Sequence, residues 1–242
     1  MPSIIIIVFV LLNVLLFLSV WIAHSVVFKR VDYDSYDSKH NLLYSDLNSE
    51  QYPREELKIQ SGKNLLTAYL YGKNNTNGLI VVSPGHTDAN DIKLYEIVYF
   101  VDNGWQVLCY DYTGSYTSQG KNLVGYNQSV HDLDAVLSYV ENDNSLKALP
   151  VVLFGHSLGA YASAAVLQYG HNVQSAVIAS GFDTPKEQWL YSIERYTGIF
   201  YYLLYPHTRL FISMQYGKEQ NLSAIDGINS VDIPVLVISG TD

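Results

Sequence analysis

Strand-length apolar runs alternate with longer segments of helical period from residue 55 onward, and this alternation is the feature that most constrains the fold. Several of the runs are apolar at every position, as expected for strands in a sheet that is covered on both faces. The alternation therefore predicts an α/β fold with a mostly parallel sheet and helices on each side. Strands are predicted at 57–60, 65–71, 79–83, 106–110, 150–154, 175–179 and 234–239, and helices at 92–101, 129–140 and 157–168.

The first thirty residues contain an uncharged apolar run from Ile4 to Ala23. A helix of about 20 residues spans roughly 30 Å, the thickness of the hydrocarbon core of a bilayer. We interpret residues 1–30 as a single transmembrane anchor that meets the membrane through residues 4–23. A cleaved signal peptide is the alternative, but the run exceeds the usual apolar region of about 7 to 15 residues and no Lys or Arg precedes it. Lys29 and Arg30 follow the run, which weakly favours a cytoplasmic location for the domain behind it.

The rest of the chain divides into a linker and one domain. Residues 31–54 are polar and are interpreted as a juxtamembrane linker, and residues 55–242 form the predicted domain. Within it, residues 182–230 are helical in pattern and rich in aromatic side chains. Thr184, Pro185 and Glu187 mark the start of this segment as an N-cap, a first-turn proline and a capping acid. We expect a lid over the carboxyl ends of the strands, with an extra helical layer of the core as an equal alternative.

Composition excludes several classes of protein. The chain is 48% hydrophobic, which is too apolar for a disordered protein. Its formal net charge of −9 argues against nucleic acid as a partner, because binding to phosphates requires a basic surface. The single cysteine, Cys109, excludes a disulfide framework and a CxxC metal or redox site.

The strongest chemical signal is the pattern Gly155-His156-Ser157-Leu158-Gly159, which lies between a predicted strand and a predicted helix. A serine hydroxyl is a weak nucleophile unless it is held on a strained turn, near a histidine base and the amides at a helix N-terminus. Gly155 and Gly159 would allow the close packing that such a turn needs. An ordinary turn with a buried serine is the alternative.

With this motif the chain resembles the α/β-hydrolase family over residues 55–242, and it is similar to membrane-anchored esterase-like or serine-aminopeptidase-like members. The stretch 81–87 resembles the family's oxyanion loop. The resemblance implies that the backbone amides of His86 and Leu158 form the oxyanion hole. Residues 111–118 resemble the loop Asp-x-x-Gly-x-Gly-x-Ser, except that Tyr116 replaces its second glycine. Residues 233–242 resemble the strand that delivers the catalytic acid.

The resemblance also implies the order serine, acid, histidine, and places the acid at or beside Asp242. No histidine follows the last predicted strand. We favour the interpretation that the sequence is truncated at its C-terminus, without its last strand and catalytic histidine. A rewired site with His207 as base and Asp183 as acid, and a non-catalytic binding domain, are the alternatives. His156 is expected to have no catalytic task.

The sequence thus predicts a serine hydrolase that cleaves carboxylic esters through an acyl-enzyme on Ser157, with thioesters and amides as further candidates. An acyltransferase with the same serine and an inactive membrane-anchored binding module are the alternatives. The expected partner is a small, apolar acyl substrate, and no metal or organic cofactor is called for. The carboxylates in His131-Asp132-Leu133-Asp134 are expected to face solvent from different sides of a helix.

Overall fold

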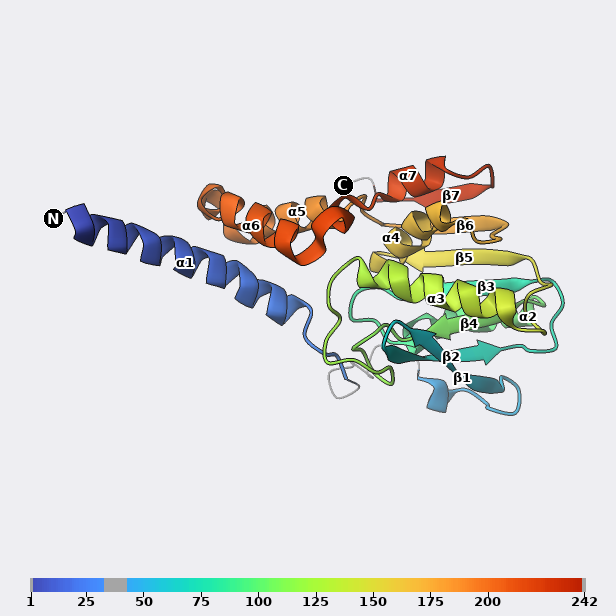
Figure 1. The fold of residues 1–242 in the computed structure, drawn as a ribbon. Helices are drawn as coiled ribbons and strands as arrows, with labels where there is room; N and C mark the ends of the chain where they lie inside the picture. Colours follow the sequence, from blue (N-terminus) through green and yellow to red (C-terminus); the bar gives the residue numbers. More distant parts are fainter. Residues whose placement is uncertain (1, 33–42, 241–242) are drawn as a thin grey trace. The chain divides into compact units, whose positions relative to one another are not determined.

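The structure is a computed structural model that describes residues 2–32 and 43–240. Its described residues form a sheet in the order β1-β2-β4-β3-β5-β6-β7 (Figure 1). β1 pairs antiparallel with β2 and β2 antiparallel with β4, and the other neighbours are parallel. The predicted mostly parallel α/β sheet is therefore confirmed. The strands are β1 (Arg54–Ser61), β2 (Asn64–Tyr71), β3 (Leu79–Ser83), β4 (Gln106–Tyr110), β5 (Val151–His156), β6 (Ser175–Ala179) and β7 (Val235–Ile238).

Helices cover both faces of this sheet. On one face, α2 (Leu94–Asp102) packs on alternate side chains of the central strands, such as Val82 and Cys109. The intervening side chains, including Val81 and Leu153, are fully buried on the other face. The helices there are α3 (Gln128–Asn142) and α4 (Leu158–Ala165), with α7 (Ala224–Asn229) packed on α4. Short 3₁₀ helices are η2 (Tyr44–Asp46), η3 (Asn90–Lys93) and η4 (Val166–Tyr169).

The chain divides into two compact units. The α/β unit contains residues 30–182 and 223–242, and the helical unit contains residues 1–29 and 183–222. The helical unit is built from α1 (Pro2–Val27), α5 (Pro185–Thr197), η5 (Gly198–Phe200), α6 (Tyr201–Tyr216) and η6 (Gly217–Asn221). The small helix α7 belongs to the α/β unit.

Inside the helical unit, the C-terminal half of α1 packs against α5 and α6. His24 is buried, and its Nε2 lies 3.2 Å from the Tyr216 hydroxyl. Trp189 Nε1 donates a hydrogen bond to the same hydroxyl at 2.9 Å. Farther along α1, Asn13 Oδ1 lies 3.1 Å from His207 Nε2 on α6. These polar contacts hold together helices whose other contacts are mainly aromatic, among them Phe17 with Phe211.

The predicted N-cap of α5 and the predicted long apolar helix are present, and the predicted start of α2 is shifted. Thr184 caps α5, because its hydroxyl accepts a hydrogen bond from the Glu187 amide at 3.2 Å, and Pro185 is the first residue of the helix. The helix predicted from residue 92 begins instead at Leu94, after η3. In α1, an 18-residue window has a mean hydropathy of 3.0 and is only 6% buried, so the predicted long apolar helix is present.

Candidate active site

Ser157 is the only residue between the end of β5 and the start of α4. Its backbone has φ 55° and ψ −116°, a conformation that residues with a Cβ rarely adopt. Two hydrogen bonds hold it: the Ser157 amide donates to Ala179 O at 2.9 Å, and Ser157 O accepts from the Tyr161 amide at 3.1 Å. The side chain is half-buried rather than sealed. The predicted strained turn between strand and helix is therefore present, and Ser157 at its tip is accessible.

The two glycines of the motif allow this turn because there is no room for a side chain at either position. A Cβ on Gly155 would lie 2.2 Å from Gly159 O, and a Cβ on Gly159 would lie 2.1 Å from Ser83 O. These are backbone atoms, so a side chain could be accommodated only if β3, β5 or α4 moved apart. The same contacts show that the first turn of α4 abuts the residues that follow β3.

The stretch 81–87, which resembles the family's oxyanion loop, covers the end of β3 and the turn after it; residues 83–88, from the end of β3 through this turn, are called the oxyanion loop from here on. Thr87 has φ 66°, and Asp88 closes the loop: its amide donates to Gly85 O at 3.3 Å, and its carboxylate accepts from the Gly85 amide at 3.1 Å. The half-buried His86 ring packs edge-on against Tyr126. Leu158 begins α4, where amides lack a partner within the helix. The fold thus brings the two predicted amide donors, His86 and Leu158, onto adjoining segments.

Burial raises the pKa of the Asp88 carboxyl above its ordinary value near 3.8. The hydrogen bond from the Gly85 amide and the charges of Lys93 and His156 oppose this rise. His156 Nδ1 is buried and has no hydrogen-bond partner among the described residues. Asp88 is therefore a buried carboxyl beside the oxyanion loop, which the sequence motifs did not single out.

The predicted acid and base are placed as follows. Asp242 lies outside the described residues. Asp183 is half-buried and directly precedes the cap of α5. His207 is on α6, where its ring nitrogens lie within 3.3 Å of Leu203 O and 3.1 Å of Asn13 Oδ1. Among the described residues of the α/β unit, no histidine forms a hydrogen bond with Ser157 Oγ.

One expectation from the sequence is wrong: Asp132 does not face solvent but is fully buried. Its carboxylate accepts hydrogen bonds from Ser61 Oγ at 2.6 Å and from the Thr113 amide at 2.7 Å, among others. Asp111 is buried in the same way and accepts from Asn90 and from Thr117 Oγ1. Buried carboxylates need such partners, and here the partners come from distant segments of the chain. Both aspartates hold the loop after β4 in place.

The structure describes residues 2–32 and 43–240, and these parts of the chain also hold His, Cys, Asp and Glu side chains away from the Ser157 turn. No group of three or more His, Cys, Asp or Glu residues there is arranged to hold a metal ion. The residues that line a hollow of about 680 Å³ come from β1, the turn after it and α3, and Ser157 is not among them. The residues that the motifs single out, Ser157 and the oxyanion loop, follow the carboxyl ends of β5 and β3.

Comparison with solved structures supports the same fold. The chain is 16% identical to an esterase from Pyrococcus furiosus, with a TM-score of 0.62, and the match covers 87% of this chain and 77% of that one. An α/β hydrolase from Vibrio vulnificus gives a TM-score of 0.64 at 14% identity, over 88% and 80% of the two chains. The thioesterase domain from the curacin biosynthetic pathway gives 0.53 at 13% identity, over 78% and 90%. At these identities the likeness shows the fold alone.

No curated protein matches the chain. A family model does match it, over residues 74–225, and its description is serine aminopeptidase, S33. The match includes the oxyanion loop, the Ser157 turn and α4, and it covers more than half of the chain. The chain therefore belongs to the serine aminopeptidase S33 family of hydrolases and has the α/β-hydrolase fold.

Proposed function

We propose that this hydrolase cleaves carboxylic esters with Ser157 as its nucleophile. The observation that carries the proposal is the backbone of Ser157, which is held in a strained conformation at the tip of the turn and leaves the side chain accessible. Strain of this kind persists only where the surrounding structure enforces it, and it is concentrated at functional sites. Two of the structural neighbours are described as an esterase and a thioesterase, which supports an acyl substrate.

In the proposed reaction, Ser157 Oγ attacks the carbonyl carbon of the ester and gives up its proton to a base. The carbonyl oxygen becomes an oxyanion, which accepts hydrogen bonds from the amides of Leu158 and His86. Removing one such donor typically lowers kcat by about 10² to 10³. Collapse of the tetrahedral intermediate breaks the ester C–O bond; the alcohol leaves with the proton held by the base, and an acyl-enzyme remains. Water then attacks the acyl carbon, releasing the carboxylic acid and restoring the serine hydroxyl.

For the acid that orients the base, we propose a residue at or beside Asp242, with Asp183 as the alternative. Activity should rise with pH through a pKa near that of an imidazole, because the base must be neutral to accept the serine proton. If His207 is that base, His207→Ala should abolish the activity. If His207 only holds α6 to α1, the variant should keep the pH profile and most of kcat.

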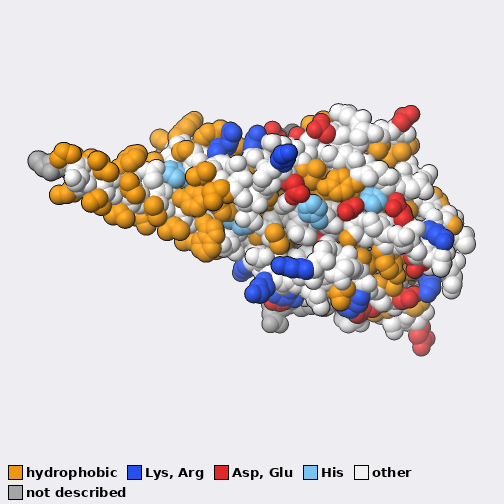
Figure 2. All heavy atoms as spheres, viewed as in Figure 1, with side chains coloured by type: hydrophobic (Ala, Val, Ile, Leu, Met, Phe, Trp, Pro, Cys, Tyr) orange, Lys and Arg blue, Asp and Glu red, His pale blue; other side chains and the backbone are white. Residues whose placement is uncertain are grey.

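We further propose that α1 anchors the protein in a membrane. The support is its length, its mean hydropathy and the exposure of most of its apolar side chains; Figure 2 shows hydrophobic side chains along this helix. A signal sequence passes the same test of length and composition. The measurement that separates the two is the N-terminal sequence of the mature protein in membranes: residues 1–30 are retained if α1 is an anchor.

The test of the proposed function is hydrolysis of p-nitrophenyl esters of increasing acyl length by the full-length protein and by Ser157→Ala. We expect saturable hydrolysis that is abolished by the substitution. Ser163→Ala is the matched control, because Ser163 is a buried serine of α4 outside the motif, and it should retain activity. Equal rates for wild type and Ser157→Ala would overturn the proposal and favour a binding module without chemistry. Release of alcohol with acyl transfer to an added acceptor would instead identify an acyltransferase.

A further inference from the structure

Residues 30–32, directly after α1 in the chain, are built into the α/β unit beside the loop that follows β4. This loop, residues 111–120, is called the β4 loop here. The Val31 amide donates to Gly114 O at 3.4 Å, and the Tyr116 amide donates to Val31 O at 2.7 Å, which forms a parallel bridge between Val31 and Ser115. Val31 is buried. The α/β unit therefore begins at Arg30, three residues after the end of α1.

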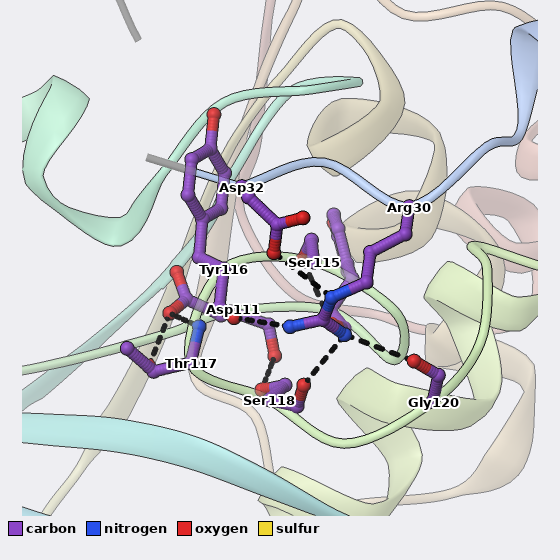
Figure 3. A network of polar contacts seen from close by, with 9 residues as sticks. Arg30, Asp32, Asp111, Ser115, Tyr116, Thr117, Ser118 and Gly120 are labelled. Carbon is purple, nitrogen blue, oxygen red and sulfur yellow. Dashed lines mark hydrogen bonds and ion pairs between the residues drawn. The ribbon is translucent and has the colours of Figure 1, made fainter. Parts of the chain in front are cut away.

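The guanidinium of Arg30 binds several groups of the β4 loop at once (Figure 3). Arg30 Nη2 donates to Tyr116 O at 2.5 Å, and Nη1 donates to Ser118 O at 3.2 Å and to Gly120 O at 2.9 Å. Its Nε donates to Asp32 Oδ1 at 2.9 Å. A planar guanidinium with five N–H donors can hold three carbonyls in fixed positions, which a lysine ammonium does less well. Arg30 thus fixes the shape of the β4 loop.

Tyr116 is the residue that departs from the family's glycine in this loop, and its backbone still has the conformation that favours glycine. Its φ is 43°, which strains a residue with a Cβ. Arg30 and Val31 hold it there by binding its carbonyl and its amide. Tyr116 is a buried residue, and its side chain supplies a ring and a hydroxyl that glycine lacks.

That hydroxyl reaches the oxyanion loop, where it donates a hydrogen bond to Thr87 O. A second tyrosine after β4, Tyr112, donates its hydroxyl to Pro84 O at 3.0 Å and is also buried. The two tyrosines therefore hold carbonyls on either side of His86. Thr87 O and the Asp88 amide belong to one planar peptide, and that amide donates to Gly85 O, which lies on the peptide that carries the His86 amide. Holding Thr87 O therefore limits how the His86 amide can rotate.

We propose that Arg30 and Tyr116 are positioning residues for the oxyanion hole: Arg30 fixes the β4 loop, and the Tyr116 hydroxyl holds Thr87 so that the His86 amide faces the substrate carbonyl. The proposal rests on the proposed function, because it assumes that the His86 amide stabilises the oxyanion. It also gives residue 30 a role in catalysis, beyond that of a charge next to a membrane helix.

The kinetic test uses Tyr116→Phe, which removes the hydroxyl and keeps the ring. We expect kcat for ester hydrolysis to fall about 10-fold or more with KM changed less than twofold, because the lost interaction acts on the transition state. Tyr44→Phe is the matched control: it also removes a hydroxyl that donates to a backbone carbonyl, Tyr52 O at 3.0 Å, but on η2. Wild-type kcat in Tyr116→Phe would overturn the proposal.

Arg30 is tested with Arg30→Lys and Arg30→Ala. We expect kcat to fall in both, less in the lysine variant, which keeps one cationic donor. The effect of Arg30→Ala should be smaller in a Tyr116→Phe background than in wild type, since the two residues act through the same contact. If the losses in kcat of Arg30→Ala and Tyr116→Phe added fully in the double variant, Arg30 would act through a different contact.

A second readout does not depend on catalysis. Hydrogen exchange at the amides of residues 85–88 should be at least fivefold faster in Tyr116→Phe and Arg30→Ala, and unchanged in Tyr44→Phe. If wild type has no activity that depends on Ser157, the proposed function fails and the catalytic part of this proposal fails with it, while faster exchange still shows that Arg30 and Tyr116 order the oxyanion loop. If exchange in the oxyanion loop is unchanged in both variants, the positioning role fails whatever the activity.

Discussion

Gly159→Ala is expected to damage both the stability and the chemistry of the protein, for a reason that can be worked out from the structure. The added Cβ would lie 2.1 Å from Ser83 O and 2.7 Å from Pro84 O, whereas ordinary contacts begin near 3.4 Å. The first turn of α4 and the end of β3 must therefore separate by about 1 Å. Overpacking against these backbone atoms should lower the free energy of unfolding by about 3 kcal/mol. For a domain of this size, that corresponds to a fall in Tm of about 6 to 12 °C.

The same movement separates the two amide donors, because Leu158 precedes Gly159 and the oxyanion loop follows Ser83. A displacement of about 1 Å at a reacting centre can lower the rate by about 100-fold. We expect this loss in kcat for ester hydrolysis, measured well below the lowered Tm so that the variant is folded. The assay is thermal unfolding in detergent together with steady-state kinetics on the same preparation.

Gly227→Ala is the matched control for this prediction. Its Cβ would lie 2.1 Å from Ala164 O, an overlap as severe as that at Gly159, but between α7 and α4 and away from the turn at Ser157. It should lower Tm by a similar amount and leave kcat within about twofold of wild type. If Gly159→Ala kept wild-type kcat, or if Gly227→Ala lost as much, the argument from the close approach of α4 and β3 would be refuted.

Further predictions concern stability. Burial raises the pKa of Asp88 in the folded protein, so this group favours folding below pH 3.8 and loses that contribution as the pH rises through its raised pKa. Asp88→Asn should therefore gain stability relative to wild type as the pH rises through this window. The measurement is denaturant unfolding across pH 3 to 8. Thr184→Ala removes the cap of α5 and should lower the free energy of unfolding by about 1 kcal/mol, whereas Thr184→Ser should restore most of it. His207 Nε2 contacts Asn13 Oδ1, and this contact is tested by a double-mutant cycle of Asn13→Leu and His207→Leu in detergent micelles. We expect a coupling of about 0.5 to 1.5 kcal/mol in the free energy of unfolding. Additive effects of the two substitutions would mean that the contact between α1 and α6 contributes nothing.

The sequence was sufficient to predict the sheet and the turn at Ser157, because these depend on local patterns. The apolar runs at 79–83, 106–110 and 175–179 coincide with β3, β4 and β6. The glycines two residues before and after Ser157 predict a close approach of backbone segments. In the structure, Gly155 faces the backbone of Gly159, and Gly159 faces the backbone of Ser83. Thr184 was identified as a cap from its neighbours along the chain alone.

The features that could not be predicted depend on contacts between distant segments. Asp132 is expected in solvent because the carboxylates near it point to different sides of a helix, but Ser61, 71 residues away, supplies a donor that allows Asp132 to be buried. Tyr116 was recognised as a departure from the family motif, yet its contact with Thr87 could not be inferred from its position in the loop. From the local sequence Arg30 is only a charge after a long apolar run, since nothing there indicates that it binds carbonyls 86 to 90 residues away.

The most direct test of the central claim, that Ser157 is an activated nucleophile, is covalent labelling with a fluorophosphonate followed by peptide mapping with mass spectrometry. Our account predicts one phosphonyl adduct per chain, carried by the peptide that contains Ser157, with slower labelling in Tyr116→Phe and none after heat denaturation. An unlabelled Ser157 in the folded protein, or an adduct on a different serine, would contradict it.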